Sequence, residues 1–409
     1  MSRDGPSTEF PEASSGRFII YAIGQAVSAS GIWMQRMSIG WIAWELTHSV
    51  GWVGAIALTE LVAAICVAPL AGAITDRCNP YLLSITTQST AVVVALTLFC
   101  ATSSGSMTLW LLFVLALLDS TWQGMNLPVR MTVINLIASR GSMARAVASN
   151  AIGFNVARAV GPALAGLIIV QAGVAFVFLV TAASFAVMIA IVFYLQTSID
   201  RPIASSSATL AVDIVDGYKY VARTPTLAAI FMLLCAFSIL GRPFTELFPA
   251  IAGEMFNGGP GVLSMLMSAQ GVGALIAGFW MLRTRSNAAI VKTTFAAAFG
   301  MAGALLIFSY VESLAVGLLL MGVAGLCHVT CNVGMQSLAQ LSAESAFRGR
   351  TMALYGLIVR AGTAASAAAI GLAAEWVGLQ PLLGGAAALC ALCVAIIFFR
   401  ARGGMLDGV

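Results

Sequence analysis

Seven charged side chains and one histidine lie inside long apolar stretches of this sequence. They are Arg36, Glu60, Asp119, Arg158, Arg242, Glu246, Arg360 and His328. On insertion scales a charge at the middle of a membrane helix costs about 2.5–3.5 kcal/mol, so each of these residues is a candidate for function. Because four arginines and three carboxylates can largely neutralise one another, we expect them to line one polar cavity.

The carboxylates suit proton transfer. Glu60 stands between Leu58 and Leu61, and burial in such apolar surroundings favours the protonated form of a carboxyl group, as a proton carrier requires. Asp119 lies in a similar stretch, and the spacing puts Trp122 and Gln123 one turn further along on the same helix face. The alternative for Glu60 is a hydrogen bond that fixes helix packing, and for the histidine a satisfied core position. The proton-coupling candidates are Glu60, Asp119, Glu246 and His328.

The arginines suit ion pairing or contact with an anion. Arg242 and Glu246 are four residues apart, which on a helix brings their side chains close enough to pair. The alternative is a pair that opens when an anionic substrate takes the arginine. Arg158 is expected to face the interior beside a carboxylate, either as a lock between helices or as a substrate contact. The substrate-cavity candidates are Trp33, Gln35, Arg36, Trp122, Gln123, Arg158, Arg242 and Arg360.

The composition indicates a membrane protein. Of the 409 residues 60% are hydrophobic and 9% are charged, whereas soluble proteins carry about 25% charged residues. The polar start of the chain lacks the basic-then-apolar pattern of a secretory signal, so the first apolar helix is expected to act as the insertion signal. There are two histidines, and the eight cysteines lie mostly in apolar stretches, so we expect no metal site.

Twelve apolar segments are long enough to cross a bilayer. They cover residues 17–45, 50–75, 81–103, 107–129, 147–171, 174–196, 225–250, 260–282, 289–311, 313–339, 351–374 and 378–400. Placing both termini in the cytoplasm puts sixteen of the twenty lysines and arginines, Arg130 among them, on the cytoplasmic side and none in the outer loops, as the positive-inside rule requires. The expected fold is an all-α polytopic bundle with both ends inside.

A polar interval divides the chain into two. Residues 197–224 form the longest hydrophilic interval, which we interpret as a cytoplasmic linker carrying an amphipathic helix. It separates a six-helix half at 17–196 from a second six-helix half at 225–400, and polar tails occupy 1–16 and 401–409. Such a construction is typical of secondary transporters, whose substrate site lies between the halves.

Several motifs resemble the major facilitator superfamily. GAITDRCNPYLL is similar to its G-x-L-A-D-R loop, and the resemblance implies that Gly72, Asp76 and Arg77 belong to a cytoplasmic gate, although the glycine and basic residues usual at 79–81 are absent. NLPVRMTVINLIASRGSMARAVASNAIGFNVARAVGPALAG resembles the branch of transmembrane secretion effectors, which includes enterobactin-type siderophore exporters and macrolide efflux pumps. ESAFRGRTMALYGLIVRAG and GIWMQRMSIGWIAWELT repeat the likeness. The resemblance covers nearly the whole chain and implies the major facilitator fold, with twelve helices in two six-helix halves.

The second of these stretches also resembles a degraded antiporter motif of the superfamily, of which Gly161, Pro162 and Gly166 remain. Small residues allow helices to pack closely, and a proline bends the helix that contains it. We therefore expect this helix to act as a pivot between the halves. In the family the motif accompanies export by proton antiport.

The sequence thus predicts a transporter rather than an enzyme. We expect an exporter of the bacterial inner membrane that works by alternating access and exchanges protons for a small amphipathic molecule such as a siderophore. The intramembrane arginines suit an anionic or metal-chelating cargo. A multidrug or macrolide efflux pump and a lipid flippase on the same fold are the alternatives. We expect a monomer in the lipid bilayer, without cofactor or nucleic-acid partner, that uses the proton gradient because no nucleotide-binding loop is present.

Overall fold

The computed structural model describes residues 15–137, 143–196, 218–281, 286–344 and 347–402. These residues are helical, with no strand among them. The main helices are α1 (Ser15–Thr47), α2 (Val50–Arg77), α3 (Pro80–Ser103), α4 (Leu109–Ile137), α5 (Met143–Ala172), α6 (Val174–Leu195), α8 (Pro225–Ala236), α9 (Phe248–Ala250), α10 (Pro260–Met281), α11 (Asn287–Phe308), α12 (Leu314–Ser342), α13 (Arg348–Val377) and α14 (Leu379–Arg402).

Two capped turns mark the ends of the bundle. Ser49, between α1 and α2, accepts a hydrogen bond from the backbone N–H of Trp52, and Asn79, between α2 and α3, accepts from Tyr81 and Leu82. Such caps satisfy N–H groups that have no partner in the first turn of a helix. We refer to the two ends of the bundle as the Ser49 end and the Asn79 end.

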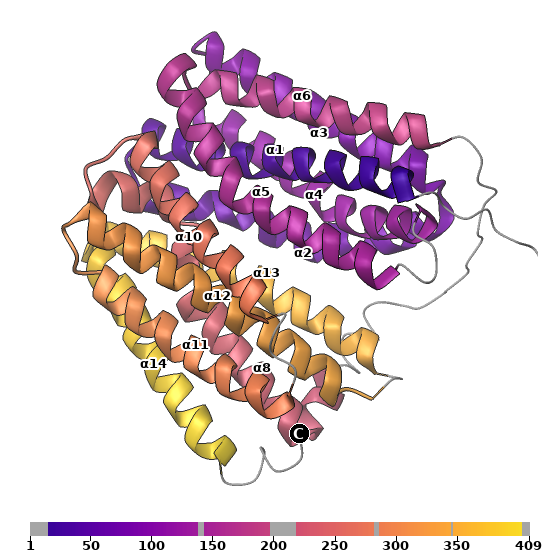
Figure 1. Cartoon of the computed structure of the whole chain (residues 1–409). Helices are drawn as coiled ribbons and strands as arrows, with labels where there is room; N and C mark the ends of the chain where they lie inside the picture. Colours follow the sequence, from indigo (N-terminus) through magenta and orange to yellow (C-terminus); the bar gives the residue numbers. More distant parts are fainter. Residues whose placement is uncertain (1–14, 138–142, 197–217, 282–285, 345–346, 403–409) are drawn as a thin grey trace, which may run out of the picture.

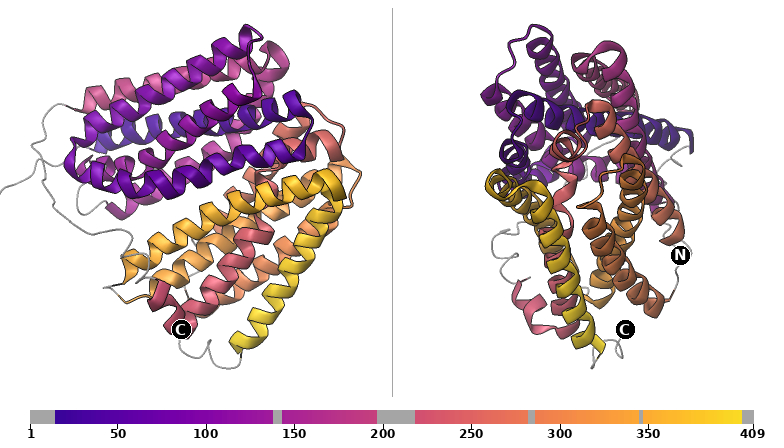
Figure 2. Two further views of the ribbon diagram at one scale, coloured as in Figure 1. Left: turned by 180° about the vertical axis from the view of Figure 1, so that it is seen from behind. Right: turned by 90° about the vertical axis from the view of Figure 1, so that its left-hand side faces the viewer.

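The helices gather in two groups. Figures 1 and 2 show α1–α6 on one side of the molecule and α8–α14 on the other. The groups meet chiefly through two helix pairs, α2 with α13 and α5 with α10. The outermost helices α6 and α14 diverge from the Ser49 end toward the Asn79 end (Figure 1).

A glycine turn recurs at matching places in the two groups. Gly173 joins α5 to α6 with a φ of 87°, and Gly378 joins α13 to α14 with a φ of 88°. A side chain at such a positive φ would clash with the backbone, so glycine is the residue suited to both turns. The two groups therefore join their fifth long helix to their last long helix in the same way.

Backbone contact without intervening side chains joins the groups. A Cβ placed on Gly54 of α2 would lie 2.7 Å from the carbonyl oxygen of Ala367 in α13, and one placed on Gly371 would lie 2.7 Å from that of Val50. Gly271 of α10 likewise lies against the backbone of Ala159 in α5. Close approach through small residues is the usual way in which membrane helices associate.

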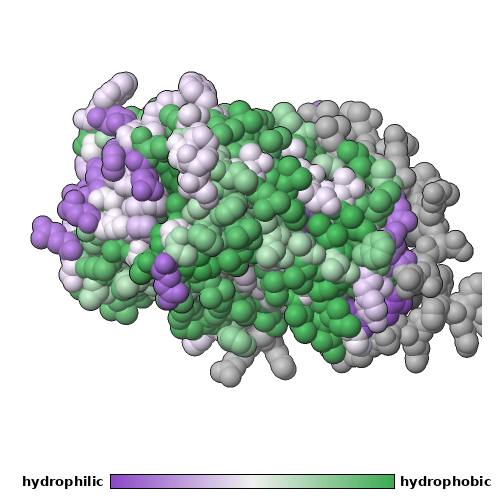
Figure 3. Space-filling model, turned by 90° about the horizontal axis from the view of Figure 1, so that it is seen from above, coloured by the Kyte–Doolittle hydropathy of each residue, from purple (hydrophilic) through white to green (hydrophobic). Residues whose placement is uncertain are grey.

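The outer surface suits lipid. Figure 3 shows an apolar surface between hydrophilic ends, and large apolar side chains such as Trp376, Val170 and Phe193 are 90%, 75% and 70% exposed. Ten helical stretches among the described residues are long and apolar enough to cross a membrane. α1 and α4 are not among them, and both contain polar or charged side chains at mid-helix. Twelve spans and the cytoplasmic position of both termini stay predictions.

Parts of the predicted organisation lie at or beyond the described residues. Gly72, Asp76 and Arg77 occupy the last turns of α2, but their side chains are outside the described set. Of the predicted linker, residues 197–217 are also outside the described set, and residues 218–223 are helical.

The predicted pivot lies within α5. Gly161 packs against Trp33 of α1, and α5 continues as one helix through Pro162. The carbonyl oxygen of Pro162 accepts a hydrogen bond of 2.8 Å from Ser264 of α10. A pivot at this position stays a prediction.

The backbone contact between the groups makes a prediction about two glycines. Gly54→Ala should destabilise the protein by about 1–3 kcal/mol, because the added methyl group meets main-chain atoms that must move. Gly303→Ala in α11 is the matched control, because its Cβ would meet no atom within 4 Å. Unfolding in mixed micelles measures both free energies. Equal effects of the two substitutions would contradict the packing described here.

Candidate functional site

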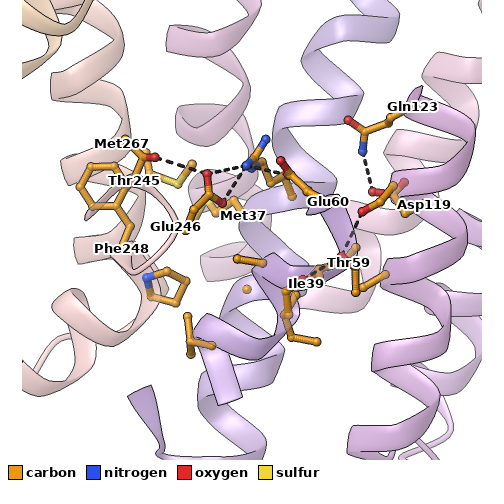
Figure 4. A pocket seen from close by; sticks show the side chains of 18 residues that line it. Met37, Ile39, Thr59, Glu60, Asp119, Gln123, Thr245, Glu246, Phe248 and Met267 are labelled. Atoms are coloured by element: carbon orange, nitrogen blue, oxygen red, sulfur yellow. Dashed lines mark hydrogen bonds and ion pairs between the residues drawn. The ribbon is translucent and has the colours of Figure 1, made fainter. Parts of the chain in front are cut away.

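One arginine joins the two groups of helices. The Nη2 of Arg36, on α1, lies 2.7 Å from Oε1 of Glu60 on α2 and 2.7 Å from each carboxylate oxygen of Glu246. Glu246 belongs to the other group, so this ion pair spans the boundary between them (Figure 4). Arg36, Glu60 and Glu246, here called the carboxylate bridge, carry two negative charges against one positive charge.

A broken helix places Glu246 toward Arg36. After α8 the chain forms a π-helical turn (Phe237–Gly241), passes Arg242 and makes a 3₁₀ turn (Pro243–Thr245) before α9. Proline at the start of the 3₁₀ turn lacks the N–H group that would continue an α-helix. This segment also explains why the expected Arg242–Glu246 pair is wrong. Two residues four apart face each other only on a continuous α-helix.

Arg242 instead bonds within its own group. Its Nη1 donates to Oδ1 of Asn332 on α12 at 3.2 Å, and the hydroxyl of Tyr355 on α13 donates to the same oxygen at 3.1 Å. Arg242 therefore has a neutral hydrogen-bond partner, and among the described residues no carboxylate lies within ion-pair distance of it.

Asp119 forms a separate cluster inside the first group. Its Oδ1 accepts hydrogen bonds from Gln35 at 2.6 Å and from Trp122 at 2.8 Å, and its Oδ2 accepts from Gln123 at 2.7 Å. The carboxylate is 5% exposed. Three neutral donors stabilise a buried negative charge without an ion pair. The sequence placed Trp122 and Gln123 on the same helix face as Asp119, whereas Gln35 comes from α1.

A small cavity lies between the carboxylate bridge and Asp119. Its volume is about 60 Å³, room for few water molecules. Its polar lining consists of Arg36, Thr59, Glu60, Asp119, Ser120, Gln123, Thr245 and Glu246. Met37, Phe248 and Met267 add apolar walls (Figure 4). Thr245, which donates to Glu246 at 3.3 Å, was not predicted, because a neutral threonine beside a charge has no distinctive pattern in the sequence.

Arg158 does not pair with a carboxylate in the described part of the chain, contrary to the expectation. Its guanidinium carbon lies 5.2 Å from the ring centre of Trp33, and that of Arg36 lies 5.5 Å from the same ring. Arg130 makes a similar contact with Phe154, which packs edge-on against Trp33. A cation over an aromatic ring is attracted to its negative face. The sequence analysis assigned Arg130 to the cytoplasmic side and so missed this contact.

The remaining candidates lie apart from the bridge. His328 is 2% exposed on α12, edge-on to Phe237, and its Nδ1 has no hydrogen-bond partner. Arg360 is exposed on α13, and no carboxylate of the described residues lies within ion-pair distance of it. No group of three or more histidine, cysteine or carboxylate side chains that could hold a metal ion occurs among the described residues.

The chain is similar to transporters over most of its length. The model of the transmembrane secretion effector family matches residues 8–405. The staphyloferrin A transporter of Staphylococcus aureus is 22% identical over 60% of this chain and 62% of its own length, so the matched part spans less than two thirds of that relative. YfiS of Bacillus subtilis, an uncharacterised transporter of the major facilitator type, is 24% identical over 87% of this chain and 86% of its own length.

A solved structure shares the fold. A bacterial homologue of the human lysosomal transporter Spinster, in an inward-facing and unoccupied conformation, superposes with a TM-score of 0.70 at 12% identity, covering 96% of this chain and 99% of that one. The expected resemblance and the all-α major facilitator fold are thereby confirmed. Proteins of this family are multi-pass membrane transporters and not enzymes.

The ion pair between the groups can be measured by a double-mutant cycle. Arg36→Gln and Glu246→Gln should show a coupling free energy of at least about 1 kcal/mol, because each removes the partner of the other. The two side chains are 29% and 14% exposed, so solvent screening keeps the coupling below that of a fully buried pair. Unfolding in mixed micelles provides the four values. Arg36→Gln with Glu312→Gln, an exposed carboxylate elsewhere, is the control cycle, and coupling of equal size there would refute the assignment.

Proposed function

Since the chain belongs to the transmembrane secretion effector family of major facilitator transporters, we propose that it is a secondary active exporter of the bacterial inner membrane. It moves a small amphipathic molecule, such as a siderophore, outward in exchange for protons. The likeness to a staphyloferrin A transporter supports a siderophore cargo. The observation that carries the proposal is the carboxylate bridge, which joins the two helix groups through one arginine.

Antiport requires that an empty carrier stay locked. A carrier that reorients without cargo or proton would dissipate the gradient, so some contact must hold the groups until one of the two binds. The ion pair between Arg36 and Glu246 meets this requirement, because it crosses the boundary between the groups. At the Ser49 end, Ser49 and the N–H of Gly51 add hydrogen bonds of 2.6 and 2.9 Å to Glu375 of α13.

A proton and an acidic cargo each break the ion pair between Arg36 and Glu246, but they act on different members of the pair. A proton on Glu246 removes the negative charge that holds Arg36, whereas an anionic cargo group takes Arg36 away from Glu246. In either case Glu60, on the same side of the boundary as Arg36, keeps the arginine compensated. Because either ligand alone breaks the pair between Arg36 and Glu246, the carrier reorients with a proton or with cargo and stays locked when it is empty.

The geometry favours the bridge over Asp119 as the proton site. All three hydrogen bonds to Asp119 come from α1 and α4 of the first group. Protonation there would leave the contact between the groups unchanged. Glu60 and Glu246 share one arginine and retain one uncompensated negative charge, so a single proton neutralises the bridge.

Transport into inverted membrane vesicles with an acidic interior tests the proposal. Wild type should accumulate staphyloferrin A against its gradient. Glu246→Gln imitates the protonated residue, so it should lose gradient-driven accumulation by about tenfold or more while still equilibrating the probe. Asp119→Asn, a matched change from carboxylate to amide in the same cavity, should retain accumulation.

Four results would contradict parts of this account. If wild type ignores the pH gradient, proton antiport is wrong. If Asp119→Asn abolishes coupling and Glu246→Gln does not, the proton site is misassigned. Accumulation of erythromycin in place of the siderophore would instead favour the macrolide pump, and movement of a fluorescent phospholipid would favour the flippase.

A further inference from the structure

Several buried hydrogen-bond donors have no acceptor in the described part of the chain. They are the Nε–H groups of Arg158 and Arg242, the indole N–H of Trp33 and the side-chain amide of Gln270. Gln270 is 4% exposed. Leaving a buried donor unpaired costs about 1–3 kcal/mol, so a set of four in one region calls for an acceptor that the protein itself does not supply.

These donors surround one part of the interior. Arg158 lies on α5 beside Ala159, which touches Gly271 of α10, the residue that follows Gln270. On its other side α5 meets α1 through Gly161, and the guanidinium of Arg158 lies over Trp33. The backbone of Gln270 packs against Gly325 of α12, and Asn332, which accepts a hydrogen bond from Arg242, lies two turns further along the same helix.

Positive charge in this region exceeds negative charge. Among the described residues the only carboxylates in ion-pair contact with an arginine are Glu60 and Glu246, and both bind Arg36. Arg158 and Arg242 are left with an aromatic ring and a neutral asparagine as their contacts. Uncompensated arginines with free N–H groups match the planar, bidentate geometry of a carboxylate.

We propose that Arg158, Arg242 and Gln270, with Trp33 beside them, form a binding site for a carboxylate group of the transported molecule. This inference rests on the proposed transport function and names the chemical class of its cargo. The site is separate from the carboxylate bridge. A cargo with two or more acidic groups places one on Arg158 and Arg242 and another within reach of Arg36, whose guanidinium contacts the same Trp33 ring.

Equilibrium binding of citrate to the purified, full-length protein in nanodiscs tests the site without a pH gradient. Isothermal titration calorimetry should detect citrate binding to wild type. Arg158→Gln and Arg242→Gln should each weaken it by about tenfold or more, since hydrogen bonds to charged groups are lost. Arg158→Lys should fall between, because lysine keeps the charge and loses the planar pair of donors. Tetraethylammonium, a cation, should not compete.

Arg130→Gln is the matched control, because Arg130 also lies over an aromatic ring and also has an unpartnered Nε. Its citrate affinity should stay within about twofold of wild type. Absence of citrate binding at millimolar concentration, or equal losses in Arg130→Gln and Arg158→Gln, would overturn the site. Since no gradient is used, arginine-dependent binding together with failed antiport would refute the transport mechanism alone. Gradient-driven transport that survives both arginine substitutions would refute the site alone.

Discussion

The structure depends on one ion pair between helices that are far apart in the chain. Arg36 of α1 is held by Glu60 of its own helix group and by Glu246 of the other group. An arginine in the apolar interior is costly unless it is paired, and here the pairing also links one helix group to the other. We propose that the unequal charge, two carboxylates for one arginine, makes the contact responsive to a single proton.

The other features of the fold place and surround this pair. Backbone contacts at Gly54 and Gly371 bring α2 close to α13, and the contact at Gly271 brings α10 close to α5. The interrupted helix around Pro243 turns Glu246 toward the first group. Asp119, whose partners all lie in the first group, orders the neighbouring wall of the cavity. The ion pair is therefore a local contact within a closely packed boundary.

The sequence predicted the helices better than the side-chain contacts between them. Composition and apolar runs sufficed for an all-helical membrane fold, because lipid leaves few other ways to satisfy the backbone. The spacing of Asp119, Trp122 and Gln123 also placed those side chains together correctly. The partner of Glu246 was not predictable, since Arg36 is 210 residues away and the expected partner Arg242 is turned aside by a helix break. The predicted carboxylate partner of Arg158 was also wrong, because its observed contact is the ring of Trp33 on another helix.

The most direct test of the central claim is the distance between the two groups at the Ser49 end as a function of pH. Spin labels at Ser103 and Glu312, with the exposed native cysteines replaced by serine, report it by double electron–electron resonance. The account predicts one short distance for wild type at alkaline pH, with a longer population appearing at acidic pH. It predicts that Glu246→Gln shows the longer population already at alkaline pH. Identical, pH-independent distances in wild type and Glu246→Gln would contradict a lock at the carboxylate bridge.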